Sequence, residues 1–172
     1  MTITIRDGGH DDIPAILGML DSCVEWLVGE GRTGQWGSKP LSENPKTVES
    51  VTRYMDEGHT YIAEVDGVPA ATVSLTGAPG AYLAHLPAGE PERYIHWLAS
   101  DRRFKGYGVG AALLAHAAEE TRRAGISLLR VDCYAGDDGK LVRYYEANGF
   151  SRVEAFTVGE SNWPGQLLAR RV

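Results

Sequence analysis

The segment 92–125 constrains the fold of this chain more than any other. It contains an apolar strand pattern, ERYIHWLAS, a short charged connector, DRRFK, three alternating glycines and an apolar helix pattern that Gly125 closes. The first amides of a helix have no partner within the helix, and the helix dipole adds partial positive charge there. Glycines let these amides approach an anion without an intervening side chain. The segment therefore predicts a phosphate or pyrophosphate site, with Lys105, Arg103 and Arg102 adding positive charge around it.

The identity of the phosphate ligand depends on the context of the glycines. Residues 106–111 contain G-x-G-x-x-A, which also fits a dinucleotide fingerprint, and Asp132 follows at a distance that suits a ribose-binding acid. That fingerprint follows its strand directly, whereas DRRFK intervenes here, and only 62 residues follow Gly110. The P-loop ending G-K-[ST] is absent. A nicotinamide-dependent oxidoreductase is therefore the less favoured alternative, and a flexible loop with one capping glycine explains three glycines poorly.

The remaining pattern predicts a mixed α/β fold. Asp11 or Asp12 can cap the first helix, Asn44 the second, and Asp66-Gly67 fits a hairpin turn. We expect strands over residues 2–6, 60–65, 69–75, 92–100, 128–134, 152–158 and 166–172, and helices over residues 11–28, 45–58, 108–124 and 139–148. This order predicts a sheet with helices on both faces, and parallel pairing of the strands that flank the third helix.

Length, charge and cysteine content limit the class of protein. The 172 residues fit a single domain over 1–172, with 43% hydrophobic and 23% charged residues, as in soluble globular proteins. No apolar run reaches about 20 residues, and the N-terminus lacks a basic and apolar leader, so we expect no membrane partner. A net charge of -6 argues against nucleic-acid binding. Cys23 and Cys133 lack metal-type spacing, which predicts reduced thiols, a cytoplasmic location and no metal.

The stretch YIHWLASDRRFKGYGVGAALL resembles the acyl-CoA-binding motif of the GNAT superfamily of N-acetyltransferases. In that family a strand ending in L-x-V precedes R-G-x-G-x-G or Q/R-x-x-G-x-G/A at a helix start. Leu98, Ala99 and Ser100 match the strand end, and residues 105–110 match the loop. Ser100 replaces the usual valine, and Lys105 replaces the usual arginine or glutamine. Because backbone amides do most of the binding in this motif, both departures leave its chemistry in place.

A second stretch, YYEANGF, resembles the late helix of the same family, A-x-x-x-Y-x-x-x-G-F. The family's tyrosine lies beside the thioester sulfur and is matched by Tyr145. Asp138 stands for the usual asparagine and Leu141 for the usual alanine, which puts the pantetheine contacts of this region in doubt. The resemblance covers nearly the whole chain. It implies a mixed, mostly antiparallel central sheet with a parallel strand pair at its centre and helices on both faces.

The resemblance implies an acetyl-CoA-dependent N-acetyltransferase, in which a primary amine attacks the thioester directly. Backbone amides near residues 98–100 would polarise the carbonyl, and Tyr145 would protonate the leaving sulfur. The alternative for Tyr145 is a packing role, and Tyr144 is the natural core residue of the pair. The implied acetyl-CoA contacts come from the strand end, the glycines and the late helix: Leu98, Ala99, Ser100, Arg103, Lys105, Gly106, Tyr107, Gly108, Val109, Gly110, Ala111 and Tyr145.

The general base is the least defined group. Family members use a glutamate on the strand before the loop, or a water relay. Strand alternation places Tyr94, His96 and Leu98 on one face, and His96 titrates near neutrality, so it is the candidate base. A histidine satisfied in the core is an equally good interpretation of His96. Glu92 is expected as a solvated loop residue.

The acceptor site is expected in the irregular loop between the first two helices. Gln35 and Trp36 are candidates for fixing and stacking on a substrate, although Trp36 fits a core position equally well. The aromatic turn 162–165 fits either the acceptor site or a subunit contact, in a monomer or a homodimer. The acidic balance favours a small cationic amine as acceptor. A binding module that senses acyl-CoA without turnover is the alternative to an enzyme.

Overall fold

The computed structural model describes residues 1–172, which form two compact units. The first unit comprises Met1–Thr76 and His96–Leu114, and the second comprises Gly77–Ile95 and Ala115–Val172. One strand, β4, and one helix, α3, contribute residues to both units. The strands are hydrogen-bonded in the order β1-β2-β3-β4-β5-β7-β6, and the β4–β5 pair is parallel. The predicted mixed sheet with one parallel pair at its centre is therefore confirmed, whereas a single domain stays a prediction.

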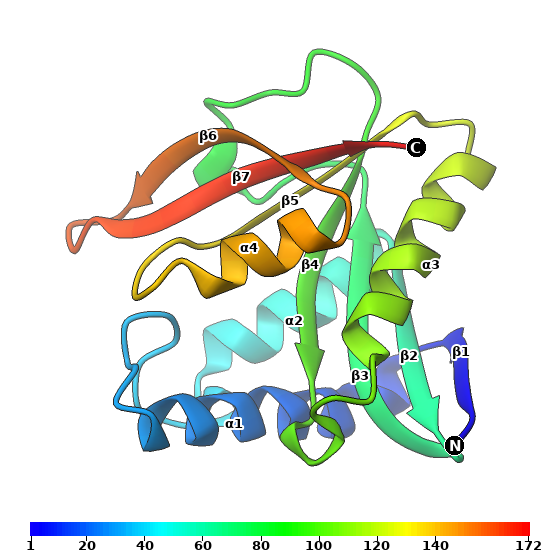
Figure 1. The fold of residues 1–172 in the computed structure, drawn as a ribbon, viewed down its shortest axis with the longest axis vertical. Helices are drawn as coiled ribbons and strands as arrows, with labels where there is room; N and C mark the ends of the chain where they lie inside the picture. Colours follow the sequence, from blue (N-terminus) through cyan, green and yellow to red (C-terminus); the bar gives the residue numbers. More distant parts are fainter. The chain divides into compact units, whose positions relative to one another are not determined.

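The strands of the first unit begin with β1 (Ile3–Asp7), β2 (His59–Val65) and β3 (Val68–Thr76), all antiparallel. Asp66 and Gly67 join β2 to β3 with φ values of 49° and 83°. Positive φ at both positions is the geometry of the tight hairpin turn that the sequence predicts. The three strands run side by side in Figure 1.

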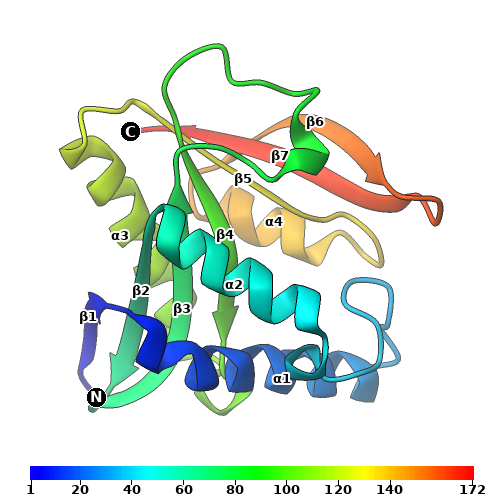
Figure 2. The same cartoon turned by 180° about the vertical axis from the view of Figure 1, so that it is seen from behind.

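Two helices cover one face of these strands. They are α1 (Ile13–Gly29) and α2 (Pro45–Glu57), and both lie in front of β2 and β3 in Figure 2. The start of α3 (Val109–Arg123) lies on the opposite face, as Figure 1 shows. Helices on both faces are thus present within this unit. The core between α1, α2 and the strands consists of Ile16, Leu20, Val51, Met55, Ile62 and Ala99.

One helix cap, at α2, is the one that the sequence predicts, and the other, at α1, differs from the prediction. Asn44 caps α2 as predicted, because its side chain accepts a hydrogen bond from the Lys46 amide at 3.0 Å. Asp12 makes no such bond into α1. Its carboxylate instead accepts the Gly9 amide at 2.9 Å and the Arg6 guanidinium at 2.8 and 3.1 Å. The carboxylate of Asp12 therefore caps the 3-10 turn His10–Asp12, which leads into α1, and it pairs with Arg6 at the same time.

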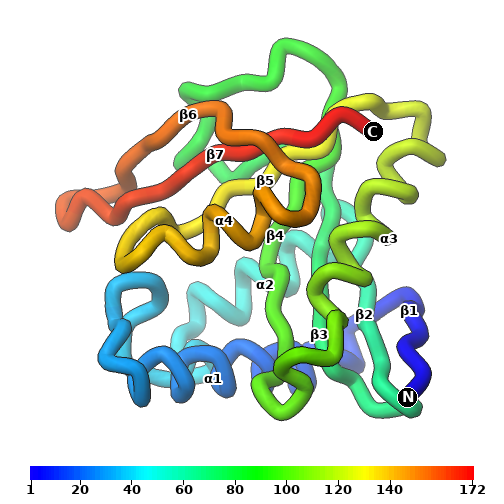
Figure 3. Tube along the Cα trace, viewed as in Figure 1, coloured from blue at the N-terminus to red at the C-terminus, as the bar shows by residue number.

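The second unit contains β5 (Leu128–Tyr134), α4 (Lys140–Ala147), β6 (Ser151–Val158) and β7 (Trp163–Arg171). Strand β7 pairs antiparallel with both β5 and β6. Helix α4 packs on β5 and β6, and the trace of Figure 3 shows it next to β5. One core cluster of this unit gathers residues of the 77–91 loop, β4, β6 and β7, namely Leu83, Tyr94, Phe156 and Leu167.

Two further observations concern the chain as a whole. Both cysteines, Cys23 and Cys133, are free thiols, in agreement with the expectation from their spacing. None of the helices combines the length and the apolar character that a membrane crossing requires.

Candidate active site

The glycine loop, residues 105–110, joins β4 (Arg93–Ser100) to α3 through a short 3-10 turn at Arg102–Phe104. Gly106 and Gly108 have φ values of 82° and 78°, which side chains other than glycine rarely adopt. A Cβ atom built at either glycine would meet no atom within 4 Å. Glycine is therefore required here by backbone direction, and the space beside it is open. Figure 3 shows this turn below the start of α3.

The amides that open α3 are available for a ligand. The first backbone hydrogen bond at this end is donated by Ala112 to the Gly108 carbonyl at 3.0 Å. The amides of Gly108, Val109, Gly110 and Ala111 donate to no backbone carbonyl. The helix dipole adds partial positive charge at the same place. These groups fit a pyrophosphate, and they lie where the sequence predicts the site.

The cations beside the glycine loop differ in what they contact. Arg103 is tied back to Asp101, with its Nη2 2.9 Å from Oδ2, so its charge is shared with a carboxylate. Lys105 is exposed, and its Nζ lies 6.0 Å from the centre of the Trp26 ring. Arg102 stacks on the same ring at 3.7 Å, and its buried Nε has no hydrogen-bond partner. The sequence predicted cations beside the loop, but it did not predict that Trp26 would contact two of them, Arg102 and Lys105.

The end of β4 does not alternate as the sequence predicts. Trp97 has a φ of 49°, which is unusual for a residue without glycine's freedom. His96 stacks on Tyr54 and Trp97 donates its Nε1 hydrogen to Ser50 Oγ, so two successive side chains face α2. The expectation that His96 and Trp97 lie on opposite faces is therefore wrong, because the left-handed residue interrupts the pleat. Beyond it come the predicted contact residues: Leu98 and Ser100, both half-buried, and Ala99, which is buried.

His96 is held among protein groups. It is 7% exposed, its ring stacks on Tyr54 with centroids 3.6 Å apart, and its Nε2 lies 2.8 Å from Thr76 Oγ1. These contacts agree with a histidine satisfied in the core, one of the two interpretations that the sequence allows. Its role as a general base stays a prediction.

The loop between α1 and α2 places its tryptophan against the core of the first unit. Trp36 is half-buried, and its ring lies 6.2 Å from that of Trp97. Gln35, beside it, is also half-buried. This packing accounts for Trp36 without a ligand, and a substrate-binding role for either residue stays a prediction.

Tyr145 lies on α4 in the second unit and is 5% exposed. Its ring meets those of Tyr144 and Phe150 edge to face, with centroids 5.7 and 5.8 Å apart. Burial raises the pKa of its hydroxyl well above the ordinary value of 10.0. Tyr144 is more exposed, at 37%, so Tyr145 and not Tyr144 is the core residue of the pair. The hydroxyl of Tyr145 stays protonated at neutral pH, as a proton donor requires.

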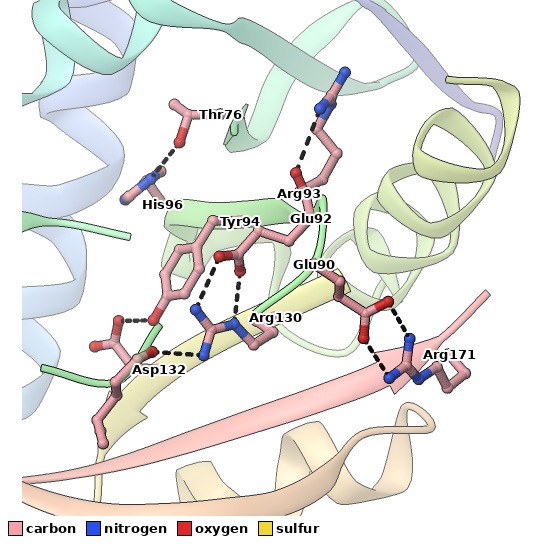
Figure 4. A network of polar contacts seen from close by, with 10 residues as sticks. Thr76, Glu90, Glu92, Arg93, Tyr94, His96, Arg130, Asp132 and Arg171 are labelled. Carbon is pink, nitrogen blue, oxygen red and sulfur yellow. Dashed lines mark hydrogen bonds and ion pairs between the residues drawn. The ribbon is translucent and has the colours of Figure 1, made fainter. Parts of the chain in front are cut away.

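Sequence reasoning missed a buried ion pair. Glu92 is 7% exposed, and its carboxylate receives Nε and Nη2 of Arg130 at 2.6 and 2.8 Å. The expectation that Glu92 is solvated is therefore wrong, because β5 carries a buried arginine that needs a counter-ion. The signal was an arginine within the apolar run LLRVDCY. Figure 4 shows the pair beside Tyr94 and Asp132.

A second polar group adjoins that pair in the second unit. Oδ2 of Asp132 accepts the hydroxyls of Tyr94 and Tyr82, at 2.5 and 2.8 Å. Burial raises the pKa of this carboxyl, while the two hydroxyls act in the opposite direction. Two tyrosine hydroxyls thus hold one oxygen of Asp132 in place.

Residues 21–150 match the model of the acetyltransferase (GNAT) family. The chain is 30% identical over 181 residues to YesJ of Bacillus subtilis, an uncharacterised N-acetyltransferase, covering 96% of this chain and 94% of that protein. The fold of the present chain resembles that of the ribosomal-protein-S18-alanine N-acetyltransferase of Escherichia coli, with a TM-score of 0.70 and 16% identity. The match covers 99% of this chain and 94% of that one. The fold also resembles that of yncA of Salmonella typhimurium, a putative acetyltransferase solved with acetyl-CoA, with a TM-score of 0.67, 16% identity, and 99% and 94% covered.

These matches decide between the two interpretations of the glycine loop. They favour a GNAT acetyltransferase over a dinucleotide-binding oxidoreductase, and the parallel β4–β5 pair agrees with the fold of the matched structures. The chain belongs to the GNAT family of acetyltransferases and is an acetyl-CoA-dependent acyltransferase.

Proposed function

We propose that this protein transfers the acetyl group of acetyl-CoA to the primary amine of a small molecule. The observation that carries the proposal is the set of free amides at the start of α3, approached by two glycines with positive φ. Four unbonded amides at a helix start form a site for a diphosphate. Family membership supplies the acyl chemistry, and the acidic net charge of -6 favours a cationic acceptor.

In the proposed reaction, the neutral amine attacks the thioester carbonyl carbon. The acceptor loses one proton before the attack and a second as the C–N bond forms, and both pass to solvent, with His96 as the candidate relay. The C–S bond breaks and the sulfur leaves as a thiolate. Amides at residues 98–100 polarise the carbonyl, and residues 105–111 hold the diphosphate. A preorganised donor aimed at developing charge is the usual source of such stabilisation.

The environment of Tyr145 refines its proposed role. A thiol has a pKa of about 8.5, whereas burial raises that of Tyr145 well above 10.0. Each unit of difference opposes full proton transfer by about 1.4 kcal/mol. The hydroxyl therefore stabilises the leaving thiolate mainly by donating a hydrogen bond, and solvent delivers the proton after the thiolate has left.

The test combines binding and turnover. Calorimetry with acetyl-CoA should show saturable heat, and a thiol-release assay over alkylamines, polyamines, amino acids and a peptide with a free amino terminus should show turnover with a small amine. Tyr145→Phe should lower kcat on the order of 100-fold and leave acetyl-CoA binding intact. Binding without turnover of any amine would indicate a sensor, and turnover of the peptide alone would contradict a small-molecule acceptor.

The same assay tests the candidate base. If His96 relays the amine proton, His96→Ala should change the shape of the pH–rate profile for kcat/KM. A profile that matches the wild type in shape and height would leave His96 as a core residue only.

A further inference from the structure

Asp132, on β5, has one carboxylate oxygen in use and one open. Oδ2 accepts the hydroxyls of both Tyr82 and Tyr94. Oδ1 accepts no hydrogen bond, yet it does not occur among the buried polar atoms that lack a partner. Oδ1 is therefore in contact with solvent. The carboxylate is anchored on one side and available on the other.

No cation of the protein neutralises this carboxylate. The nearest candidate, Arg130, directs Nε and Nη2 to Glu92 and Nη1 to the Leu86 carbonyl at 2.9 Å. Figure 4 shows the guanidinium paired with the carboxylate of Glu92. Only the two tyrosine hydroxyls act to lower the pKa of Asp132, against its burial. A part-buried carboxylate without a cation is costly to the folded state, so a ligand that supplies the positive charge would bind favourably.

Asp132 lies on β5, and α4, the helix that carries Tyr145, packs on this strand within the second unit. In agreement with this placement, the carboxylate of Asp132 is one of the groups that raise the pKa of Tyr145, after burial, Cys133 and Tyr144. It also adds to burial, the larger cause, in raising the pKa of its chain neighbour Cys133 to about 12. Asp132 and the residue proposed to stabilise the leaving sulfur therefore lie on packed elements of the same unit.

We propose that Oδ1 of Asp132 binds the ammonium group of the acceptor. The inference rests on the proposed function, since it names the class of acceptor for that reaction. Alkylamines have a pKa near 10.4, as lysine does, and arrive as ammonium ions with N–H donors that suit a carboxylate. The same oxygen repels an acceptor that carries a carboxylate beside its amine. The site therefore selects alkylamines or polyamines over amino acids.

The test follows Asp132 directly and does not depend on turnover. The side-chain carboxyl ¹³C resonance of Asp132, assigned by its loss in Asp132→Asn, is recorded while n-butylammonium chloride is added. We expect a saturable shift with n-butylammonium and none with 1-butanol, its neutral counterpart. Binding measured on other nearby resonances should weaken roughly tenfold or more in Asp132→Asn, as expected for a hydrogen bond to a charged group.

The matched control is Asp137→Asn. Asp137 is exposed on the loop after β5, carries the same charge, and has a φ of 58° that asparagine tolerates. Its variant should bind n-butylammonium like the wild type, which separates a specific site from the loss of one negative charge. Equal binding by the wild type and Asp132→Asn, or no saturable shift in the wild type, would overturn the inference.

The outcome can be separated from that of the proposed function. Acetyl-CoA calorimetry and thiol release on the same samples report the reaction. If the protein turns over an amine but the Asp132 resonance does not respond, the site is wrong and the function stands. If the resonance responds and acetyl-CoA gives no heat, the cation site stands and the function is wrong.

Discussion

The glycine loop of the first unit and the polar network of the second present charged or partly charged groups in two different ways. In the loop, four backbone amides and a helix dipole point outward, and no side chain is required to hold them. In the network, Glu92, Arg130, Tyr94 and Asp132 each depend on a partner brought from another element. Backbone donors are fixed by φ and ψ, whereas side-chain charges are fixed only by one another. The two regions should therefore respond differently to single substitutions.

The largest effect is expected from Arg130→Met. Removing the guanidinium leaves Glu92 buried without a counter-ion, which typically costs about 3–5 kcal/mol of stability. Urea unfolding of the variant measures this loss. The double variant Glu92→Leu/Arg130→Met removes both charges and should regain most of it. A loss below about 1 kcal/mol in the single variant would mean that the pair is solvated and that the two regions do not differ in this respect.

The next effect concerns the loop. Gly108→Val forces a branched side chain into a left-handed backbone, which costs about 1–2 kcal/mol or redirects the amides. We expect kcat/KM for acetyl-CoA to fall on the order of 100-fold, because the donors no longer face the diphosphate. The control is Gly67→Val, whose φ of 83° in the hairpin turn imposes the same strain. It should lose stability and keep kcat/KM; equal losses of kcat/KM would show a general effect of strain.

The smallest effect concerns how stability depends on pH, and it is tested on one aspartate from each unit, Asp12 and Asp132. The hydrogen bonds from Arg6 lower the pKa of Asp12 below its ordinary value of 3.8. The ionised side chain therefore stabilises the folded state at any pH above 3.8. This stabilisation is lost as the pH falls through the lower pKa of the folded state. Burial raises the pKa of Asp132, so its ionised form costs stability at neutral pH and the cost disappears below 3.8.

Asp12→Asn should therefore destabilise the protein at pH 7 by up to about 1 kcal/mol, and the difference should shrink as the pH falls below 3.8. Asp132→Asn, which keeps an acceptor for the tyrosines, should instead stabilise it at pH 7, again with a difference that shrinks in acid. Thermal unfolding from pH 7 to pH 3 measures both. Effects of the same sign at pH 7 would contradict the contrast between a carboxylate that is paired with arginine and one that is not.

The sequence predicted well what depends on local pattern. The strands and helices, the hairpin at Asp66-Gly67 and the glycine loop follow from spacing and from residues that suit one backbone geometry. The parallel pairing around α3 followed from the order of elements. These features need no knowledge of which distant residues meet.

The sequence failed where distant side chains meet or where the backbone departs from regularity. Glu92 precedes its strand and Arg130 follows 38 residues later, so nothing local shows that they pair. The left-handed Trp97 breaks the alternation that placed His96, because strand periodicity assumes an unbroken pleat. Asp12 acts as a cap one turn earlier than expected, because a 3-10 turn precedes α1. These departures arose where tertiary contacts or an irregular backbone outweighed a local preference.

The edge strand β6 carries a feature with consequences for the behaviour of the protein in solution. Its register against β7 shifts between Arg152 and Glu154, which leaves Val153 as an extra residue that is 55% exposed. An inserted residue at a free edge bends and twists the strand, so that its outer amides and carbonyls do not form a straight ladder. A second chain cannot easily extend the sheet across such an edge. The irregularity therefore protects a mostly exposed strand against ribbon-like aggregation at high concentration.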